Sequence, residues 1–143
     1  AQFVEVEVDI ETGKIRLLDY LACQDSGTVV NPQELKNQVI GGAIVGAGFA
    51  IYEALKFDKE TGAIKNGSLL DYKILRAGDF PWQADVLFGE SYDPVGPFGA
   101  RGAGESPMAA GIAAVAQAVY NAIGIWVDLP MTPENVVRAL NKV

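Results

Sequence analysis

The chain of 143 residues contains no histidine and only one cysteine, Cys23. Without histidine it cannot build a Ser-His-Asp or Cys-His nucleophilic site, and a zinc or haem site held by its own side chains is disfavoured. If a metal functions here, something other than this chain must hold it. A lone cysteine excludes an internal disulfide and favours a reducing compartment, so we expect a cytoplasmic location.

Basic residues are also scarce. Eleven lysines and arginines face 18 acidic residues, which gives a net charge of −7, and no cluster of basic residues stands out. This balance disfavours nucleic acid and anionic membrane surfaces as partners. The uncharged run from Gln38 to Tyr52 is shorter than the roughly 20 residues of a membrane-spanning helix, so no membrane span is expected.

Strand patterns are short and few. Alternating valines and acidic residues predict a half-buried strand over Phe3–Asp9, and a returning strand runs from Ile15 to about Cys23. We predict a second hairpin between Phe57 and Ile64, and another strand over Ala84–Phe88.

A long helix is predicted to begin after Asn31, because Asn as N-cap, Pro32 and Glu34 are agreeing start signals. It extends to about Leu55. Four glycines lie inside it: Gly41, Gly42, Gly46 and Gly48. Each costs up to about 1 kcal/mol relative to alanine, so we expect another backbone or a flat ligand to approach this helix closely.

Two further helices are predicted near the end of the chain. The first covers Pro107–Ile123, with Ser106 as N-cap and Gly124 after its end, and the second runs from Thr132 through Leu140. The length fits one domain. The predicted fold class is therefore α+β: a single domain of β-hairpins or mixed sheet, a long glycine-rich helix and two C-terminal helices.

The loop before Pro107 is dense in glycine, with Gly96, Gly99, Gly102 and Gly104, and it delivers Glu105 to a helix start. Exposed N–H groups beside one acid suit an anionic or oxo-bearing ligand and proton transfer. The alternative is that Glu105 only complements the helix dipole. A phosphate-binding loop is disfavoured because Glu105 stands where its lysine should be.

Three other polar features leave alternatives open. Gln38 lies one turn before the glycine cluster, where its amide could contact a polar heterocycle or simply be exposed. Arg101 could bind an anion or be solvated. The segment Asp25-Ser26-Gly27 is typical of a polar turn.

Five segments occur in an order that resembles a known family: residues 22–32, 38–48, 71–74, 96–105 and 130–134. They are similar to the C-terminal part of the molybdopterin-binding subunit in the xanthine dehydrogenase and aldehyde oxidase family of molybdenum hydroxylases. The resemblance covers nearly all of residues 1–143, which it identifies as a C-terminal portion of the molybdopterin-binding domain.

The resemblance implies a role for several residues. Glu105 matches the active-site base beside molybdenum, and Gln38 matches a glutamine that lies against the pterin. The other matching cofactor-binding positions are Gly41, Gly42, Gly102, Ala103 and Gly104. No side chain binds the metal, because the dithiolene of the pterin holds it.

The resemblance also implies an activity: hydroxylation of an aldehyde or N-heterocycle carbon with water-derived oxygen. Molybdopterin, with its cytosine dinucleotide form as one alternative, would be the cofactor, while a 2Fe-2S cluster and FAD would belong to partner chains or domains. The remaining partners would be the rest of the molybdenum subunit and a small-molecule substrate, which this chain does not specify. A chain of this length is not expected to be active alone and is either a small subunit or a fragment.

Two positions depart from the family pattern. Val45 replaces a second glutamine, and Arg101 stands where lysine is common. Val45 puts one polar cofactor contact in doubt and favours the alternative function, a non-catalytic structural or interaction domain that retains the fold. A phosphate- or nucleotide-binding module is the third alternative, against which Glu105 counts.

Overall fold

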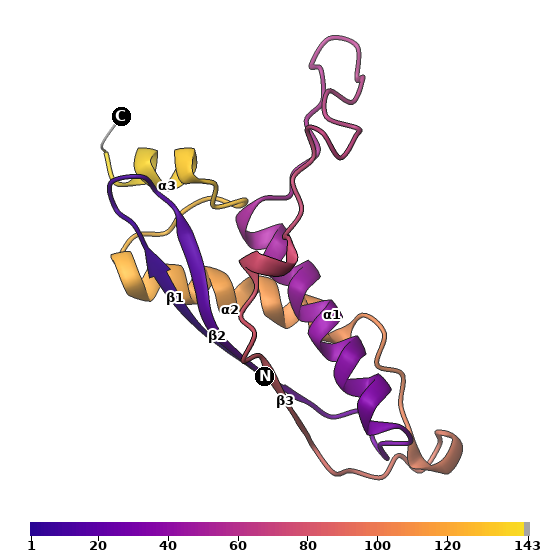
Figure 1. Ribbon diagram of the computed structural model, residues 1–143. Coiled ribbons are helices and arrows are strands. Elements are labelled where there is room, and N and C mark those ends of the chain that lie inside the picture. Colours follow the sequence, from indigo (N-terminus) through magenta and orange to yellow (C-terminus); the bar gives the residue numbers. More distant parts are fainter. Residues whose placement is uncertain (142–143) are drawn as a thin grey trace.

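The computed structural model describes residues 1–141, which form a three-stranded sheet covered by helices (Figure 1). Strands β1 (Gln2–Val8) and β2 (Ile15–Gln24) pair antiparallel, and β3 (Asp85–Phe88) pairs parallel with β2. The sheet order is β1-β2-β3. The two long strands agree within one residue with those predicted from alternation, and the α+β class is confirmed.

Within residues 1–141, three α-helices accompany this sheet: α1 (Pro32–Ile51), α2 (Ser106–Ile123) and the short α3 (Pro133–Ala139). Helices α1 and α2 pack against each other, and α2 lies behind β1 and β2 in Figure 1. Two single-turn 3₁₀ helices, η1 (Ala77–Asp79) and η2 (Pro97–Gly99), interrupt the connections.

The hydrophobic core fills the space between the sheet and the two long helices. Most of its buried members come from β2, α1 and α2: Ile15, Leu17, Tyr20, Ala22, Val39, Ala43, Ala47, Ala50, Ile51, Val115 and Val119. The core is completed by Phe80, Val86 of β3, Val127, Met131 and Val136 of α3. Small alanines on α1 let the helix approach the sheet and α2 closely, which explains why a glycine- and alanine-rich helix is buried here.

Close approach of another backbone, expected for the glycine-rich helix, is confirmed at two of its glycines. A Cβ at Gly46 would collide with the carbonyl oxygen of Met108, and one at Gly42 would lie 2.8 Å from Cβ of Pro107. On the facing helix, a Cβ at Gly111 would lie 3.4 Å from Cα of Gly46. Because no side chain separates them, α1 and α2 pack backbone to backbone.

The start of α1 agrees with the prediction, but its end does not. The Asn31 side chain accepts a hydrogen bond from the Glu34 amide (3.2 Å), as expected of an N-cap. The helix stops at Ile51 rather than Leu55, because the amides of Tyr52 and Glu53 both donate to the carbonyl of Gly48 and close the last turn.

The start of α2 differs from the prediction by one residue, because the helix begins at Ser106 and not at Pro107. Ser106 is the first helical residue and Glu105 is the N-cap, although its side chain makes no capping hydrogen bond. Instead of capping, the Ser106 hydroxyl accepts a hydrogen bond from the Gln24 amide at the end of β2 (3.0 Å). Thr132 caps α3 through the Asn135 amide. This helix covers Pro133–Ala139, so it is one residue shorter at each end than the predicted range from Thr132 through Leu140.

The second predicted hairpin is wrong as a pair of strands. Phe57 and Ile64 form a single antiparallel bridge, within a projecting segment of residues 53–76 that we call the arm (Figure 1). Across residues 1–141, no helix is both long and apolar enough to cross a membrane.

The helix crossing generates a prediction about two glycines of α1. Gly46→Ala should destabilise the chain by about 1–3 kcal/mol, because its Cβ has no space beside Met108. Gly41→Ala is the matched control: its Cβ would meet nothing within 4 Å, so higher helix propensity should stabilise the chain by up to about 1 kcal/mol. Urea unfolding measures both free energies, and equal stability of the two variants would contradict the crossing.

Candidate functional site

The structure brings together Gln38 of α1 and the glycine-rich loop before α2. The side-chain amide Nε2 of Gln38 donates a hydrogen bond to the carbonyl oxygen of Gly104 (2.7 Å). Glu105 follows directly, at the N-cap of α2. Two residues far apart in the sequence therefore lie side by side on one exposed surface.

The carboxylate of Glu105 is not used to hold the fold. Glu105 is exposed and its side chain makes no capping hydrogen bond. Among residues 1–141, none forms a hydrogen bond or ion pair with this carboxylate. The backbone carbonyl of Glu105, by contrast, accepts from the Met108 amide (3.0 Å) and starts the helix. The acid is therefore positioned by its backbone while its carboxylate faces outward.

The glycines beside this acid fall into two groups. A Cβ at Gly41, Gly102 or Gly104 would meet nothing within 4 Å, so packing inside the chain does not explain these glycines. At Gly42 the contact with Pro107 does explain the missing side chain. The first group leaves an open backbone surface around Gln38 and Glu105, which a flat molecule can approach closely.

Backbone bonds tie the loop to the connection between β2 and α1. The Arg101 amide donates to the Ser26 carbonyl (2.8 Å), and the Thr28 amide donates to the Gly99 carbonyl (2.8 Å). Gly27 and Ala100 form an antiparallel bridge. Two stretches of irregular backbone thus support each other, which holds the loop leading to Glu105.

The structure decides the role of Arg101, which the sequence left open. Its Nε donates to Oδ2 of Asp93 (2.8 Å), and its Nη1 lies 3.8 Å from Oδ2 of Asp25. The guanidinium is therefore engaged within the loop. Sequence reasoning missed Asp93, whose position in an Asp-Pro-Val-Gly turn was the available signal.

Both of these aspartates are stabilised in the charged form. The Ser91 hydroxyl (2.7 Å) and then the Gly27 amide (2.9 Å) donate to Asp25 and lower the pKa of its carboxyl group. The amides of Val95 and Gly96, with the Arg101 guanidinium, lower the pKa of Asp93. The expected polar turn at residues 25–27 is thus confirmed by the Asp25–Gly27 bond, and it also anchors the loop.

The end of β2 fixes the start of α2 from the other side. The side-chain amide of Gln24 donates to the hydroxyls of Ser106 (3.0 Å) and Ser26 (3.2 Å). Sequence reasoning also missed Gln24, because nothing in the local pattern shows which distant residue lies beside it. Through this contact, the sheet helps to set the direction in which α2 leaves Glu105.

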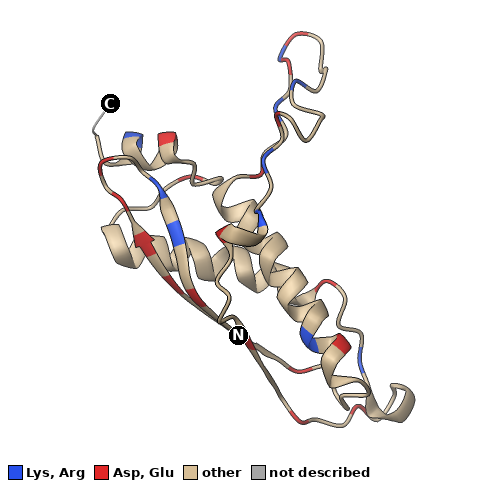
Figure 2. Ribbon diagram, in the orientation of Figure 1, with Lys and Arg blue, Asp and Glu red and all other residues tan. Residues whose placement is uncertain are grey.

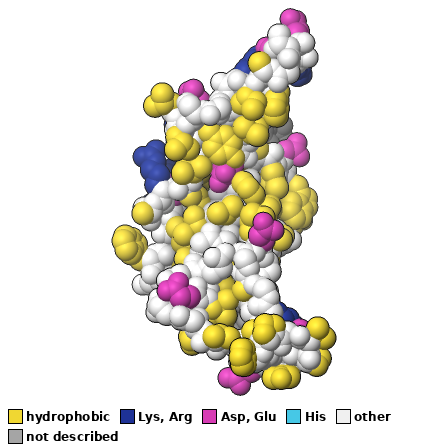
Figure 3. Space-filling view, turned by 90° about the vertical axis from the view of Figure 1, so that its right-hand side faces the viewer, with side chains coloured by type: hydrophobic (Ala, Val, Ile, Leu, Met, Phe, Trp, Pro, Cys, Tyr) yellow, Lys and Arg dark blue, Asp and Glu magenta, His cyan; other side chains and the backbone are white. Residues whose placement is uncertain are grey.

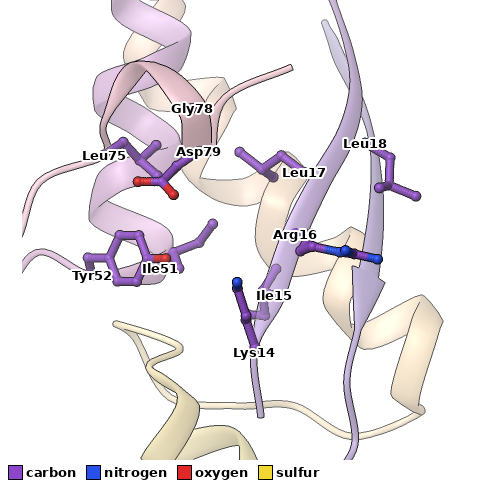
Figure 4. A pocket seen from close by; sticks show the side chains of 10 residues that line it. All are labelled: Lys14, Ile15, Arg16, Leu17, Leu18, Ile51, Tyr52, Leu75, Gly78 and Asp79. Carbon is purple, nitrogen blue, oxygen red and sulfur yellow. The ribbon is translucent and has the colours of Figure 1, made fainter. Parts of the chain in front are cut away.

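Two clefts lie at the other end of α1. One of about 360 Å³ is shown in Figure 4, where Lys14 and Ile15 from β2 and its preceding turn face Tyr52 and Asp79. A neighbouring cleft of about 580 Å³ shares Lys14, Tyr52 and Asp79. Both lie at the C-terminal end of α1, away from Gln38. The surface around Gln38 and Glu105 is exposed.

The described residues offer no metal centre of their own. Within residues 1–141, no three or more His, Cys, Asp or Glu side chains are grouped to hold a metal ion. The polar groups beside Glu105 are backbone groups, the Gln38 amide and the Ser106 hydroxyl. Such a set is suited to hydrogen bonding with a polar organic molecule.

The anchoring of the loop generates a pH prediction. Folding lowers the pKa of Asp93 below its ordinary value of 3.8, so the carboxylate adds stability above that pH, and this contribution is lost as the pH falls through the folded-state pKa. Asp93→Asn removes the charge paired with Arg101. Melting curves should show a higher melting temperature for wild type than for the variant at pH 6, and this difference should shrink below about pH 3.8. A difference in melting temperature that stays constant down to pH 3 would contradict this role of the charge.

Comparisons with known proteins agree on one family. Residues 1–81 match the family described as molybdopterin cofactor-binding domain. The chain is 38% identical to the aldehyde oxidoreductase molybdenum-binding subunit PaoC of Escherichia coli (strain K12), over 96% of its own length and 19% of that protein. It is 36% identical to the putative xanthine dehydrogenase molybdenum-binding subunit XdhA of the same organism, over 92% of its length and 18% of that protein.

Solved structures agree with this result. Quinoline 2-oxidoreductase from Pseudomonas putida 86 superposes with a TM-score of 0.89 at 32% identity, over 96% of this chain and 18% of that one. The aldehyde oxidoreductase from Desulfovibrio gigas gives 0.86 at 31% identity, over 96% and 15%. The chain thus spans less than a fifth of these relatives. It belongs to the molybdopterin cofactor-binding domain family, in the group of xanthine dehydrogenase and aldehyde oxidase molybdenum-binding subunits.

Proposed function

We propose that the chain supplies the proton-accepting glutamate and one wall of the cofactor site to a molybdenum hydroxylase. The observation that carries this proposal is the hydrogen bond from Gln38 to Gly104, because it sets a side-chain amide beside the outward-facing carboxylate of Glu105. An acid that has no partner within residues 1–141, on a surface where several glycines have no side chain, suits proton transfer to or from a bound molecule.

The residues around Glu105 fit a flat, polar cofactor. Gly41, Gly102 and Gly104 leave space where a side chain would stand, and Gln38 has an amide oxygen that is not used in its bond to Gly104. With Gly42 and Ala103, these residues would hold molybdopterin, in its simple or its cytosine dinucleotide form. When bound, the cofactor supplies two-electron redox chemistry at a molybdenum held by its own sulfurs.

The role that we assign to Glu105 is that of general base. Its carboxylate would accept the proton of the water-derived oxygen as that oxygen forms a bond to an electron-poor carbon of the substrate. The hydrogen and the two electrons of the broken C–H bond would pass to the oxidising centre that the cofactor supplies. The N-cap position of Glu105 holds the backbone of this acid rigidly, and the Gln38 bond fixes the preceding carbonyl. Proton transfer depends on such fixed geometry, because small displacements of a base reduce the rate strongly.

The substrate class and partners follow from the same proposal. An aldehyde or an N-heterocycle carbon would be hydroxylated, and its electrons would leave through a 2Fe-2S cluster and FAD on partner chains or domains. A relative with 35% identity over 97% of this chain is named as subunit gamma of the 6-hydroxypseudooxynicotine dehydrogenase complex of Paenarthrobacter nicotinovorans, which supports assembly with other subunits. We place the complex in the cytoplasm, in keeping with the single cysteine.

One observation favours a second function, that of a non-catalytic interaction domain. Val45 is 41% exposed on α1, where the family pattern has a glutamine, so one polar contact to a cofactor is missing. A single lost contact lowers affinity without removing the base. The two functions differ in whether Glu105 determines turnover.

Glu105→Gln tests the proposed function in the assembled enzyme. The change keeps the size of the side chain and removes proton acceptance, so turnover per bound molybdenum should fall about 10²–10⁴-fold. If Glu105 only complements the helix dipole, stability should drop by at most about 1 kcal/mol and the rate should be nearly intact. Steady-state turnover, metal analysis and melting curves on one preparation separate these outcomes.

The matched control is Glu134→Gln, an exposed acid in the first turn of α3 that lies on another helix. It should leave turnover unchanged. A Glu105→Gln enzyme within tenfold of wild type would refute the catalytic role and favour the interaction domain. Wild-type protein that contains no molybdenum would refute the proposed function as a whole.

Gln38→Ala should reduce cofactor occupancy more than it changes the rate of the occupied fraction. The variant leaves the Gly104 carbonyl and the cofactor each without one polar partner, which costs roughly 1–3 kcal/mol of binding where the groups are buried. Molybdenum and pterin content of the purified enzyme measure this loss. Gln33→Ala is the control on the same helix, because Gln33 bonds to Asn37 (3.2 Å) and not to the loop. Full occupancy with collapsed turnover would instead make Gln38 catalytic.

A further inference from the structure

The arm leaves the body of the molecule at the end of α1 and projects away from the sheet (Figure 1). Its base is closed by one buried asparagine. The Asn66 side chain accepts from the Lys56 amide (2.7 Å) and donates to the Ala54 carbonyl (2.8 Å). The Tyr72 hydroxyl adds a bond to the Glu53 carboxylate (2.8 Å). The two sides of the arm are therefore fastened by polar groups.

The tip of the arm is fixed in the same way. Asp58 accepts from the amides of Glu60 (3.1 Å) and Thr61 (3.0 Å) and pairs with Lys65 (2.9 Å). The Lys65 ammonium, followed by these amides, lowers the pKa of Asp58 to about 2. The Asp58 amide also donates to the Ala63 carbonyl (2.8 Å). Hydrogen bonds and one ion pair thus define the shape of the arm without a hydrophobic core.

The apolar side chains of the arm face outward. Asn66 is the only buried residue among residues 53–76, all of which the structure describes. Leu69 and Leu70 are 75% and 86% exposed. The exposed large apolar residues of the arm are Leu55, Phe57, Ile64, Leu69, Leu70 and Ile74. In Figure 3, hydrophobic side chains are exposed over the upper part of the molecule, below the tip of the arm.

The arm therefore exposes large apolar side chains beside its polar ones. Exposed apolar patches of this kind mark interaction sites. A recess of about 270 Å³ lies beside Leu69, lined also by Leu55, Asn66 and Tyr72, and offers space for a side chain of a partner. Because the arm is already shaped by its hydrogen bonds, little ordering is needed when it binds.

We infer that the arm is a preformed docking element for the remainder of the molybdenum-binding subunit, with Leu69 and Leu70 as its apolar anchor. The inference rests on the proposed function, in which this chain is one part of a longer subunit. The relatives support that occupant, because four fifths or more of their length has no counterpart in this chain. Figure 2 shows both acidic and basic residues along the arm. The arm therefore has no excess of one sign of charge that would repel a protein surface of mixed charge.

Hydrogen exchange of residues 53–76, followed by mass spectrometry, tests the docking. The arm amides of the intact molybdenum-binding subunit should exchange about tenfold or more slowly than those of the 143-residue chain. Leu69→Ser combined with Leu70→Ser should remove most of this protection in the intact subunit. Lys59→Ser combined with Glu60→Ser is the matched control, because both residues are exposed polar groups on the same arm, and it should retain the protection.

Two outcomes would overturn the inference. Equal exchange in the intact subunit and the chain would mean that the remainder does not cover the arm. Protection that rises with subunit concentration would assign the arm to a second copy instead. Both results come from the wild-type protein, so they stand even if the double-serine variant fails to fold. Molybdenum content, measured in parallel, separates this test from the test of the proposed function. A subunit that contains no molybdenum but has a protected arm would refute the proposed function and leave the docking inference intact.

Discussion

The backbone contact between α1 and α2 is the constraint on which the candidate site depends. Gly46 of α1 and Gly111 of α2 have no side chains at the crossing, so the two helices approach as closely as their backbones allow. The contact between Gly42 and Pro107 then fixes the first turn of α2 against α1. At this separation the Gln38 amide donates a hydrogen bond to the Gly104 carbonyl beside Glu105.

A second set of contacts holds the glycine-rich loop in place beside the crossing of α1 and α2. The sheet contributes Gln24, which reaches Ser106, and the β2–α1 connection contributes backbone bonds to Gly99 and Arg101. The Arg101 guanidinium pairs with Asp93 and Asp25, whereas no residue of 1–141 bonds to the carboxylate of Glu105. The loop therefore combines two properties that a site needs: support by hydrogen bonds from β2 and the β2–α1 connection, and an exposed acid that has no partner within residues 1–141.

Sequence reasoning succeeded where the signal was local and failed where it depended on a partner. The Asn31 cap, the alternation in β1 and the turn that leads into β2 are short-range patterns, and the bounds of both strands were predicted within one residue. Ser106 was predicted as a cap from its residue type, but a distant glutamine uses its hydroxyl. The predicted hairpin around residues 59–62 forms as a turn with an antiparallel bridge between Phe57 and Ile64, which is too little pairing to make strands.

By itself the sequence determined the family, the α+β class and the residues that are candidates for chemistry, because glycine spacing, capping residues and a lone acid are properties of short segments. It also indicated that the glycines of α1 need a close neighbour. Only the tertiary structure decided which glycines have one: α2 fills the space beside Gly42 and Gly46, while Gly41 stays open. The same holds for Arg101, whose partner depends on how two distant loops meet. A side chain's role follows from what lies beside it in space, and that is fixed by the packing of the whole chain.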